Sequence, residues 1–204
     1  MVKVRALCDL KGYKKGSTND YGLVQELWAL LDEADFVIAH NADRFDILES
    51  NTRFVIHGLT PPSPYSTIDT LKIARGRFHF KSNKLDDLGR DLGVGRKIPH
   101  TGAHLWFGCM SGDKKSWALM KRYNKQDVFL LEKVYEKLRP WGNHPNINVP
   151  TGRTGACPAC GSFSIVRRGH VYTRSTEAQR YVCINCGKWS SDKPEPLAKK
   201  ITIK

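Results

Sequence analysis

The sequence has no long apolar run and no recognisable leader. No segment approaches the roughly 18 to 20 consecutive apolar residues that a membrane-spanning helix needs, which excludes an integral membrane protein of that kind. The first 15 residues also lack the apolar stretch of a secretory signal. We therefore expect a cytoplasmic protein with no membrane partner.

Acidic side chains are few. Asp and Glu total 20 against 33 Lys and Arg, which gives a net charge of +13 over 204 residues. Such an excess favours a polyanionic partner, usually nucleic acid, and a basic protein without such a partner is the alternative. Hydrophobic residues make up 40% of the chain, enough to bury a core, so wholesale disorder is excluded.

Four of the six cysteines form two Cys-x-x-Cys pairs, Cys157 with Cys160 and Cys183 with Cys186, and a glycine follows each pair. Such a turn directs two thiolates at one ion, and two turns complete a tetrahedral sulfur site that suits Zn²⁺. Short strand-like runs lie between the pairs, so we predict a zinc ribbon. Two structural disulfides are the alternative, and they would require an oxidising compartment.

The predicted zinc is structural, because four cysteines leave no open coordination position for water. Residues 151–204 hold 10 basic but only 3 acidic side chains. The pattern of this segment resembles zinc ribbons attached to transposases and phage DNA enzymes. The resemblance implies DNA contact, although such ribbons also dock proteins. The arginines expected to bind substrate here are Arg167, Arg168, Arg174 and Arg180.

The segment 140–150 carries three prolines and three asparagines, which is typical of an extended linker. The composition also changes at this point, because the basic last quarter of the chain begins here. We predict four parts: a larger domain over residues 1–140, a linker over 141–151, the zinc ribbon over 152–191 and a basic tail over 192–204.

The larger domain alternates between strand-like and helix-like patterns, which is typical of an α/β fold with a partly parallel sheet. Strands are expected over 35–40 and 66–69. Helices are expected after the N-cap residues 17–20 and over 41–58, 70–77, 85–92 and 113–138. The apolar side of the last helix is expected to comprise Trp117, Met120, Val128, Leu131 and Val134.

Two groups of residues in this domain indicate chemistry. His40-Asn-Ala-Asp-Arg-Phe-Asp46 follows a predicted strand, at the edge of the sheet where α/β folds place their ligands. Tyr123 and Asp127 are four residues apart and lie on one face of a predicted helix.

His-Asn-x-x-x-Phe-Asp followed by Tyr-x-x-x-Asp resembles the second and third motifs of the DEDD-type, or DnaQ-like, 3′–5′ exonucleases. The tyrosine in the third motif makes the sequence resemble the DEDDy branch of this family. Segments 31–41, 68–71 and 82–89 agree with the same family, most closely with phage and prophage versions that carry a zinc ribbon. The resemblance extends from about residue 20 to 190 and implies a ribonuclease H-like α/β fold.

The resemblance implies hydrolysis of phosphodiester bonds by two Mg²⁺ or Mn²⁺ ions, which carboxylate oxygens hold. Asp127 would ligate the metal on the nucleophile side, and Asp46 would reach the other metal, often through water. Tyr123 would orient the attacking water.

Three further residues are expected to contact substrate. Asn41 and His40 would shape the strand end and the groove, and Phe45 would pack beneath the site. For His40, a hydrogen-bonded histidine at a strand end is favoured over a direct metal ligand.

The sequence departs from the family at the first motif, Asp-x-Glu, because no such pair occurs in residues 1–30. Either residues 2–10 correspond to the family's third strand and the first two are absent through truncation, or they form the central strand with Asp9 as a degenerate motif. The residues after this segment favour truncation, so the expected domain is N-terminally incomplete.

The expected function is therefore a 3′–5′ exonuclease acting on single-stranded 3′ ends of DNA, which the missing carboxylates would leave inactive as written. The alternative is a non-catalytic nucleic-acid-binding protein on a nuclease scaffold. A docking adaptor for replication or recombination proteins is a third, less favoured hypothesis. The resemblance implies DNA rather than RNA as the partner, in the cytoplasm of a bacterium or of a phage-infected host.

Overall fold

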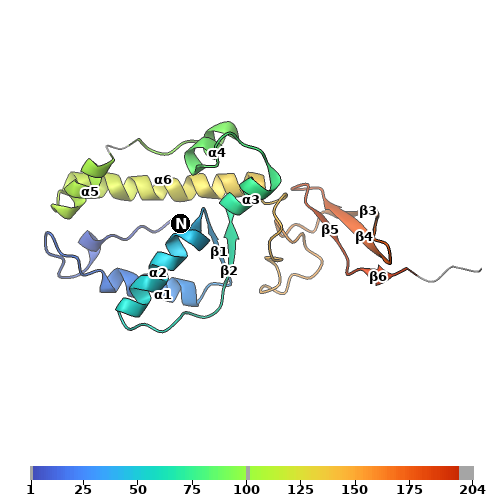
Figure 1. The fold of residues 1–204 in the computed structure, drawn as a ribbon, viewed down its shortest axis with the longest axis horizontal. Helices are drawn as coiled ribbons and strands as arrows, with labels where there is room; N and C mark the ends of the chain where they lie inside the picture. Colours follow the sequence, from blue (N-terminus) through green and yellow to red (C-terminus); the bar gives the residue numbers. More distant parts are fainter. Residues whose placement is uncertain (1, 100–101, 198–204) are drawn as a thin grey trace, which may run out of the picture. The chain divides into compact units, whose positions relative to one another are not determined.

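The computed structural model describes residues 2–99 and 102–197, and the chain divides into two compact units, residues 1–138 and 139–204 (Figure 1). The first unit combines helices with a parallel sheet, and the second is built on antiparallel strands. The mixed α/β class expected from the sequence is confirmed. The domain bounds stay a prediction. Within the described ranges, no helix combines the length and apolar character needed to cross a membrane.

The first unit follows the alternating order of an α/β chain. Its elements are η1 (Leu7–Asp9), α1 (Tyr21–Asp32), β1 (Phe36–Ala39), η2 (Ala42–Arg44), α2 (Asp46–Ile56), β2 (Ser66–Asp69), α3 (Thr70–Arg77), α4 (Leu85–Asp91), α5 (Ala103–Met110) and α6 (Lys114–Leu138). The strand predicted over 66–69 and the helix predicted over 70–77 are confirmed. The helix α5 was not predicted; it is short and contains one glycine, Gly108, a residue that disfavours a helix interior.

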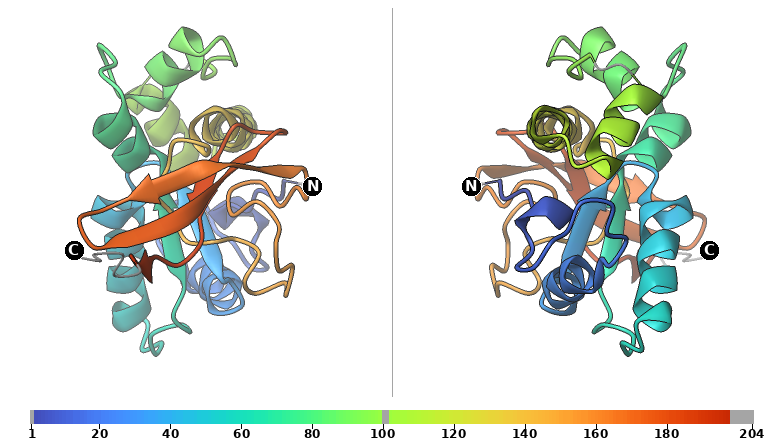
Figure 2. Two further views of the ribbon diagram at one scale, coloured as in Figure 1. Left: turned by 90° about the vertical axis from the view of Figure 1, so that its right-hand side faces the viewer. Right: turned by 90° about the vertical axis from the view of Figure 1, so that its left-hand side faces the viewer.

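Strands β1 and β2 pair in parallel, from Phe36 opposite Ser66 to Ala39 opposite Asp69. Helices α1 and α2 pack on this sheet through a cluster formed by Val24, Leu31 and Phe54. Since the carboxyl ends of parallel strands meet at one edge, the residues after Ala39 and the start of α3 lie together there (Figure 2).

The long helix α6 has α5 packed near its start and α3 and α4 near its end (Figure 1). Its buried side chains are Met120, Leu130, Val134, Tyr135 and Leu138. Met120 and Val134 were predicted, but Val128 is 46% exposed. The prediction was wrong for Val128. Helix α4 contacts α6, and the buried face of α6 includes Leu130 instead of Val128.

Residues 2–10 do not form a strand, which corrects both interpretations of this segment. Leu7–Asp9 is a short 3-10 helix, and the Asp9 carboxylate accepts a hydrogen bond from the Ala6 backbone N–H at 3.0 Å. Such local side-chain bonds compete with an extended backbone. Asp9 is also paired with Lys121 of α6, so it does not lie in a strand beside Val37.

The second unit contains β3 (Ile165–Tyr172), β4 (Thr176–Cys183), β5 (Trp189–Ser191) and β6 (Glu195–Pro196), with β4 paired to the other three. The segment predicted as a linker is hydrogen-bonded within this unit. The buried Asn148 amide donates to the Cys157 carbonyl at 2.7 Å, and the Ile147 N–H donates to the Pro158 carbonyl at 3.2 Å. Of the expected tail, residues 198–204 lie outside the described residues.

The start of α1 and the end of α2 are joined by the Asp20 carboxylate. It accepts hydrogen bonds from Arg53 Nε at 2.8 Å and His57 Nε2 at 2.7 Å. Burial alone would raise the pKa of Asp20, but the bonds from Arg53 and His57 outweigh it and hold the pKa below its usual value.

We predict that Asp20→Asn lowers the free energy of unfolding at neutral pH by about 1–3 kcal/mol in urea titrations.

The wild-type advantage should be present above the unfolded-state pKa of Asp, about 3.9, and be lost as pH falls through the lower folded-state value. The matched control is Glu26→Gln, which breaks an exposed pair with Arg5 and should change stability much less than Asp20→Asn. Equal effects of the two variants would contradict the prediction.

Candidate functional site

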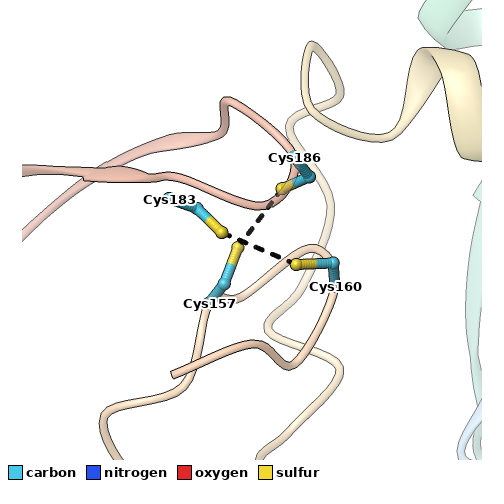
Figure 3. A group of neighbouring side chains, drawn as sticks. All are labelled: Cys157, Cys160, Cys183 and Cys186. Carbon is cyan, nitrogen blue, oxygen red and sulfur yellow. Dashed lines mark hydrogen bonds between the residues drawn. The ribbon is translucent and has the colours of Figure 1, made fainter. Parts of the chain in front are cut away.

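The four cysteines predicted as zinc ligands converge in the second unit (Figure 3). Their sulfur atoms all lie within 4.8 Å of one another. Cys157 Sγ lies 3.6 Å from Cys186 Sγ, and Cys160 Sγ lies 3.7 Å from Cys183 Sγ. In a tetrahedral site with Zn–S bonds of about 2.3 Å, the sulfurs lie about 3.8 Å apart. Disulfide sulfurs would lie about 2.0 Å apart, so these four thiols are unbonded.

The two turns have the same local construction. The glycine after each pair has a positive φ, 72° at Gly161 and 78° at Gly187, which a side chain would strain. The N–H of Gly161 donates to the Cys157 carbonyl at 2.9 Å, and the N–H of Gly187 donates to the Cys183 carbonyl at 2.8 Å. Each turn therefore points two sulfurs to one side.

The donor set suits zinc. Burial alone would raise the pKa of Cys160, but hydrogen bonds from the Ser162 backbone and the Asn185 amide outweigh it and lower the pKa to about 7. Burial raises the pKa of Cys186 and of Cys157. Four thiolates this close together are unfavourable without a cation, and a bound Zn²⁺ would stabilise all four in that form. These residues fit a closed structural site, which holds the fold and leaves no position for catalytic water.

His40 lies at the end of β1, and its ring bridges three segments. Nδ1 is 2.9 Å from the Thr70 hydroxyl at the start of α3, and Nε2 is 3.0 Å from the Asn83 carbonyl. Burial lowers the pKa of His40. The Asn83 carbonyl can only accept, so Nε2 donates to it, and the Thr70 hydroxyl beside Nδ1 also donates to the Ala39 carbonyl at 3.0 Å. Both ring nitrogens are engaged by protein atoms, which agrees with the hydrogen-bonded strand-end histidine favoured from the sequence.

Asn41 has a left-handed backbone with φ of 67°, which asparagine tolerates better than most residues. Its N–H donates to Asp69 Oδ1 at 2.9 Å, and the same oxygen accepts the Leu71 N–H at 2.8 Å. Asp69 is 7% exposed, so this one carboxylate oxygen joins the ends of both strands to the start of α3.

Phe45 and Asp46 lie at the start of α2. Phe45, which was expected to pack beneath a site, is 65% exposed and lies directly before α2. Asp46 is exposed and lines, with Phe45, a cavity of about 450 Å³ between α1, α2 and β1.

Tyr123 and Asp127 lie one turn apart on α6, as predicted, and both contact Lys97. The Lys97 ammonium is 2.8 Å from Asp127 Oδ2 and 3.2 Å from the Tyr123 hydroxyl, and 5.3 Å from the centre of the tyrosine ring. Burial would lower the pKa of Lys97, but the Asp127 and Tyr123 hydrogen bonds outweigh it and raise the pKa. Asp127 Oδ1 is buried and has no hydrogen-bond partner among the described residues.

The residues present do not fit a two-metal centre. Across the described ranges, the cysteine cluster is the only convergent group of three or more His, Cys, Asp or Glu ligand atoms. Asp127 offers one buried oxygen, while its other oxygen is paired with a cation. Mg²⁺ requires near-octahedral oxygen coordination and dehydrates reluctantly.

The model of the RNase H superfamily matches residues 8–139. The chain belongs to this superfamily. No curated protein and no solved structure matches the chain. Members with the RNase H-like fold are commonly nucleases that use divalent metals, so membership indicates a nuclease or nucleic-acid-binding protein.

The four arginines expected to bind nucleic acid are all exposed in the second unit. Arg167 and Arg168 lie on β3, Arg174 lies in the turn that follows, and Arg180 lies on β4. The Arg180 guanidinium stacks over the Trp189 ring, 5.3 Å from its centre. Such a pair is an amphipathic surface of the kind that nucleic acids contact.

Sequence reasoning missed Lys97 and Asp69. Asp69 was part of a segment quoted for the family resemblance, and its place directly before a predicted helix was a capping signal. Lys97 lies in a loop after α4, and no local pattern connects it to Tyr123, because that contact spans 26 residues.

We predict that the purified chain contains one zinc per molecule, held by the four cysteines. Structural zinc contributes about 10 kcal/mol or more to the folding of small zinc-binding peptides. Cys183→Ser should therefore lose the metal and make residues 139–204 protease-sensitive, while residues 1–138 stay resistant. Elemental analysis and limited proteolysis measure the two effects.

The control is Cys8→Ser, which removes a half-exposed thiol outside the cluster and should keep the zinc. Wild-type protein without zinc after purification in the absence of chelators would contradict the prediction, as would equal loss in both variants.

Proposed function

We propose that this RNase H-like domain belongs to the DEDDy branch of 3′–5′ exonucleases and that, with the residues present, it binds single-stranded 3′ ends of DNA but hydrolyses them poorly. The observation that carries the proposal is the Lys97–Asp127 ion pair beside Tyr123. A nuclease carboxylate needs to be free for a metal, and here a side-chain ammonium neutralises it.

The resemblance to that branch is supported by the positions of its residues. Tyr123 and Asp127 share one face of α6, and Asn41 lies at the carboxyl end of β1. Asp46, which the family motif would make the second metal-binding carboxylate, begins α2. The first-motif carboxylates have no counterpart near Asp127: among the described residues, Asp127 belongs to no group of three or more ligand atoms that lie close together.

Nucleic-acid binding without hydrolysis is the second candidate function, and the +13 charge favours it. In this proposal the ribbon provides exposed arginines for the phosphate backbone, and zinc holds the ribbon folded. DNA is proposed over RNA on the resemblance to phage enzymes, and replication or recombination proteins are the proposed protein partners.

We predict little release of nucleotides from a labelled single-stranded 3′ end in Mg²⁺ or Mn²⁺. Wild type and Asp46→Asn and Asp127→Asn variants should be alike, because the charge stabilisation of a two-metal site, worth several kcal/mol, is missing in all of them. The control is Glu132→Gln, an exposed residue on the same helix. Robust wild-type activity that Asp127→Asn abolishes and Glu132→Gln preserves would contradict the poor-nuclease proposal.

We also predict that binding to single-stranded DNA weakens steeply with salt. Replacing Arg167, Arg168, Arg174 and Arg180 with alanine should flatten the slope of log affinity against log salt by about 0.7 for each phosphate that is no longer neutralised. Fluorescence anisotropy at several salt concentrations measures the slope. An unchanged slope in the fourfold variant would assign the ribbon to protein docking instead.

A further inference from the structure

A cavity of about 720 Å³ opens where β1 ends, between the start of α3 and the loop before α4. Its lining includes four cationic residues, Arg75, Lys81, Lys84 and Lys97, together with His40 and Asn41. We infer that this cavity is a phosphate-binding subsite for the backbone of a single nucleic-acid strand. The inference rests on the proposed function for the identity of the polyanion, whereas the anion-binding chemistry rests on the cavity itself.

The cations of this cavity come from separate segments and face one space. Arg75 lies on α3, Lys81 and Lys84 lie in the loop before α4, and Lys97 lies in the loop after α4. Among the described residues, no carboxylate lies within ion-pair distance of Arg75, Lys81 or Lys84. All three are exposed, so their charges are available to a ligand.

The acidic residue of the lining does not cancel this charge. Asp86 accepts the Lys97 backbone N–H at 2.7 Å and the Arg96 guanidinium at 3.1 Å, and these bonds hold its pKa below the usual value. It therefore acts as a support that positions the loop of Lys97. The cavity keeps three cations without an acidic partner, which favours a ligand with more than one negative oxygen.

His40 lines the same cavity as the cations. Burial is the largest cause of its lowered pKa; the Asn83 hydrogen bond and Asp69 raise the pKa, and the charges of Lys97 and Arg75 lower it. The cationic residues thus act on a ring that lines the same space. A neutral His40 adds no charge of its own, so the anion would be bound by the Arg and Lys side chains.

Lys97 also lines a second cavity, of about 600 Å³, together with Tyr123 and Arg96. The two cavities therefore share one cation, which is paired with Asp127. A strand whose phosphate occupies the first cavity would lie beside the Tyr123–Asp127 face of α6. This arrangement connects the subsite to the residues that the family resemblance singled out.

The test compares two triple variants of the full-length chain. Arg75→Ala with Lys81→Ala and Lys84→Ala removes the three unpaired cavity cations. Lys114→Ala with Lys133→Ala and Lys137→Ala removes the same charge from exposed positions on α6 outside the cavity. Anisotropy of labelled single-stranded DNA is measured at several salt concentrations without added divalent ions, after circular dichroism has confirmed folding. If the cavity triple variant does not fold, Lys81→Ala alone replaces it, because Lys81 lies in a loop.

The cavity variant should lose about ten- to a hundredfold in affinity near 0.1 M salt and flatten the salt slope by up to about two units, if each cation contacts one phosphate. The control variant should change both much less. Equal losses in the two variants would overturn the inference, since net charge alone would then explain binding. Wild-type affinity in the cavity variant would overturn it as well.

A second arm separates this inference from the proposed function. Inorganic phosphate is titrated into the ¹⁵N-labelled protein while the amide signals of residues 81–84 and 97 are followed. Saturable shifts in wild type that the cavity variant lacks support the subsite, even if wild type fails to bind DNA and the proposed function is wrong. DNA binding by wild type with no phosphate shifts and no loss in the cavity variant overturns the subsite alone.

Discussion

One buried carboxylate oxygen holds the functional edge of the first unit together. Asp69 Oδ1 accepts the N–H of Asn41 after β1 and the N–H of Leu71 in α3. This fixes the left-handed turn at Asn41 and places His40 between the Thr70 hydroxyl and the Asn83 carbonyl. The loop before α4, which carries the cavity lysines, is thereby attached to the strand end. A buried charged acceptor of this kind is costly to leave unsatisfied, so the arrangement is well determined.

The charges near that edge carry the proposal of binding over catalysis. The Lys97 ammonium lies against Asp127, and its raised pKa keeps it charged across the physiological range. Asp46 lines a separate cavity with apolar neighbours. The chain belongs to the RNase H superfamily, but among the described residues no group of three or more His, Cys, Asp or Glu ligand atoms includes Asp127. The zinc-type cluster has its own core of buried cysteines in the second unit, so its folding does not depend on this edge.

Predictions from the sequence were most accurate where residues close together in the chain determine the structure. The Cys-x-x-Cys-Gly turns predicted the convergence of Cys157 and Cys183, because spacing and glycine conformation determine such a turn. The strand at 66–69 and the helix that follows it were likewise predicted from the local pattern of the chain. Residues 2–10 were misjudged, because the family resemblance assigned them to a strand while Asp9 satisfies a backbone N–H locally. The contact between Lys97 and Asp127 could not be predicted from the sequence, because the two residues are 30 positions apart and meet only in the folded chain.

The absence of an assembled two-metal centre in these residues can be measured directly through Mn²⁺ binding. The electron paramagnetic resonance signal of free Mn²⁺ is recorded while zinc-loaded wild-type protein is added, with Asp127→Asn as the comparison. We predict that neither wild type nor the variant reduces the signal of free Mn²⁺ at submillimolar Mn²⁺. Lys97 neutralises Asp127, and among the described residues Asp127 belongs to no group of three or more ligand atoms. Binding of two Mn²⁺ ions per chain in wild type, lost in Asp127→Asn, would contradict the account.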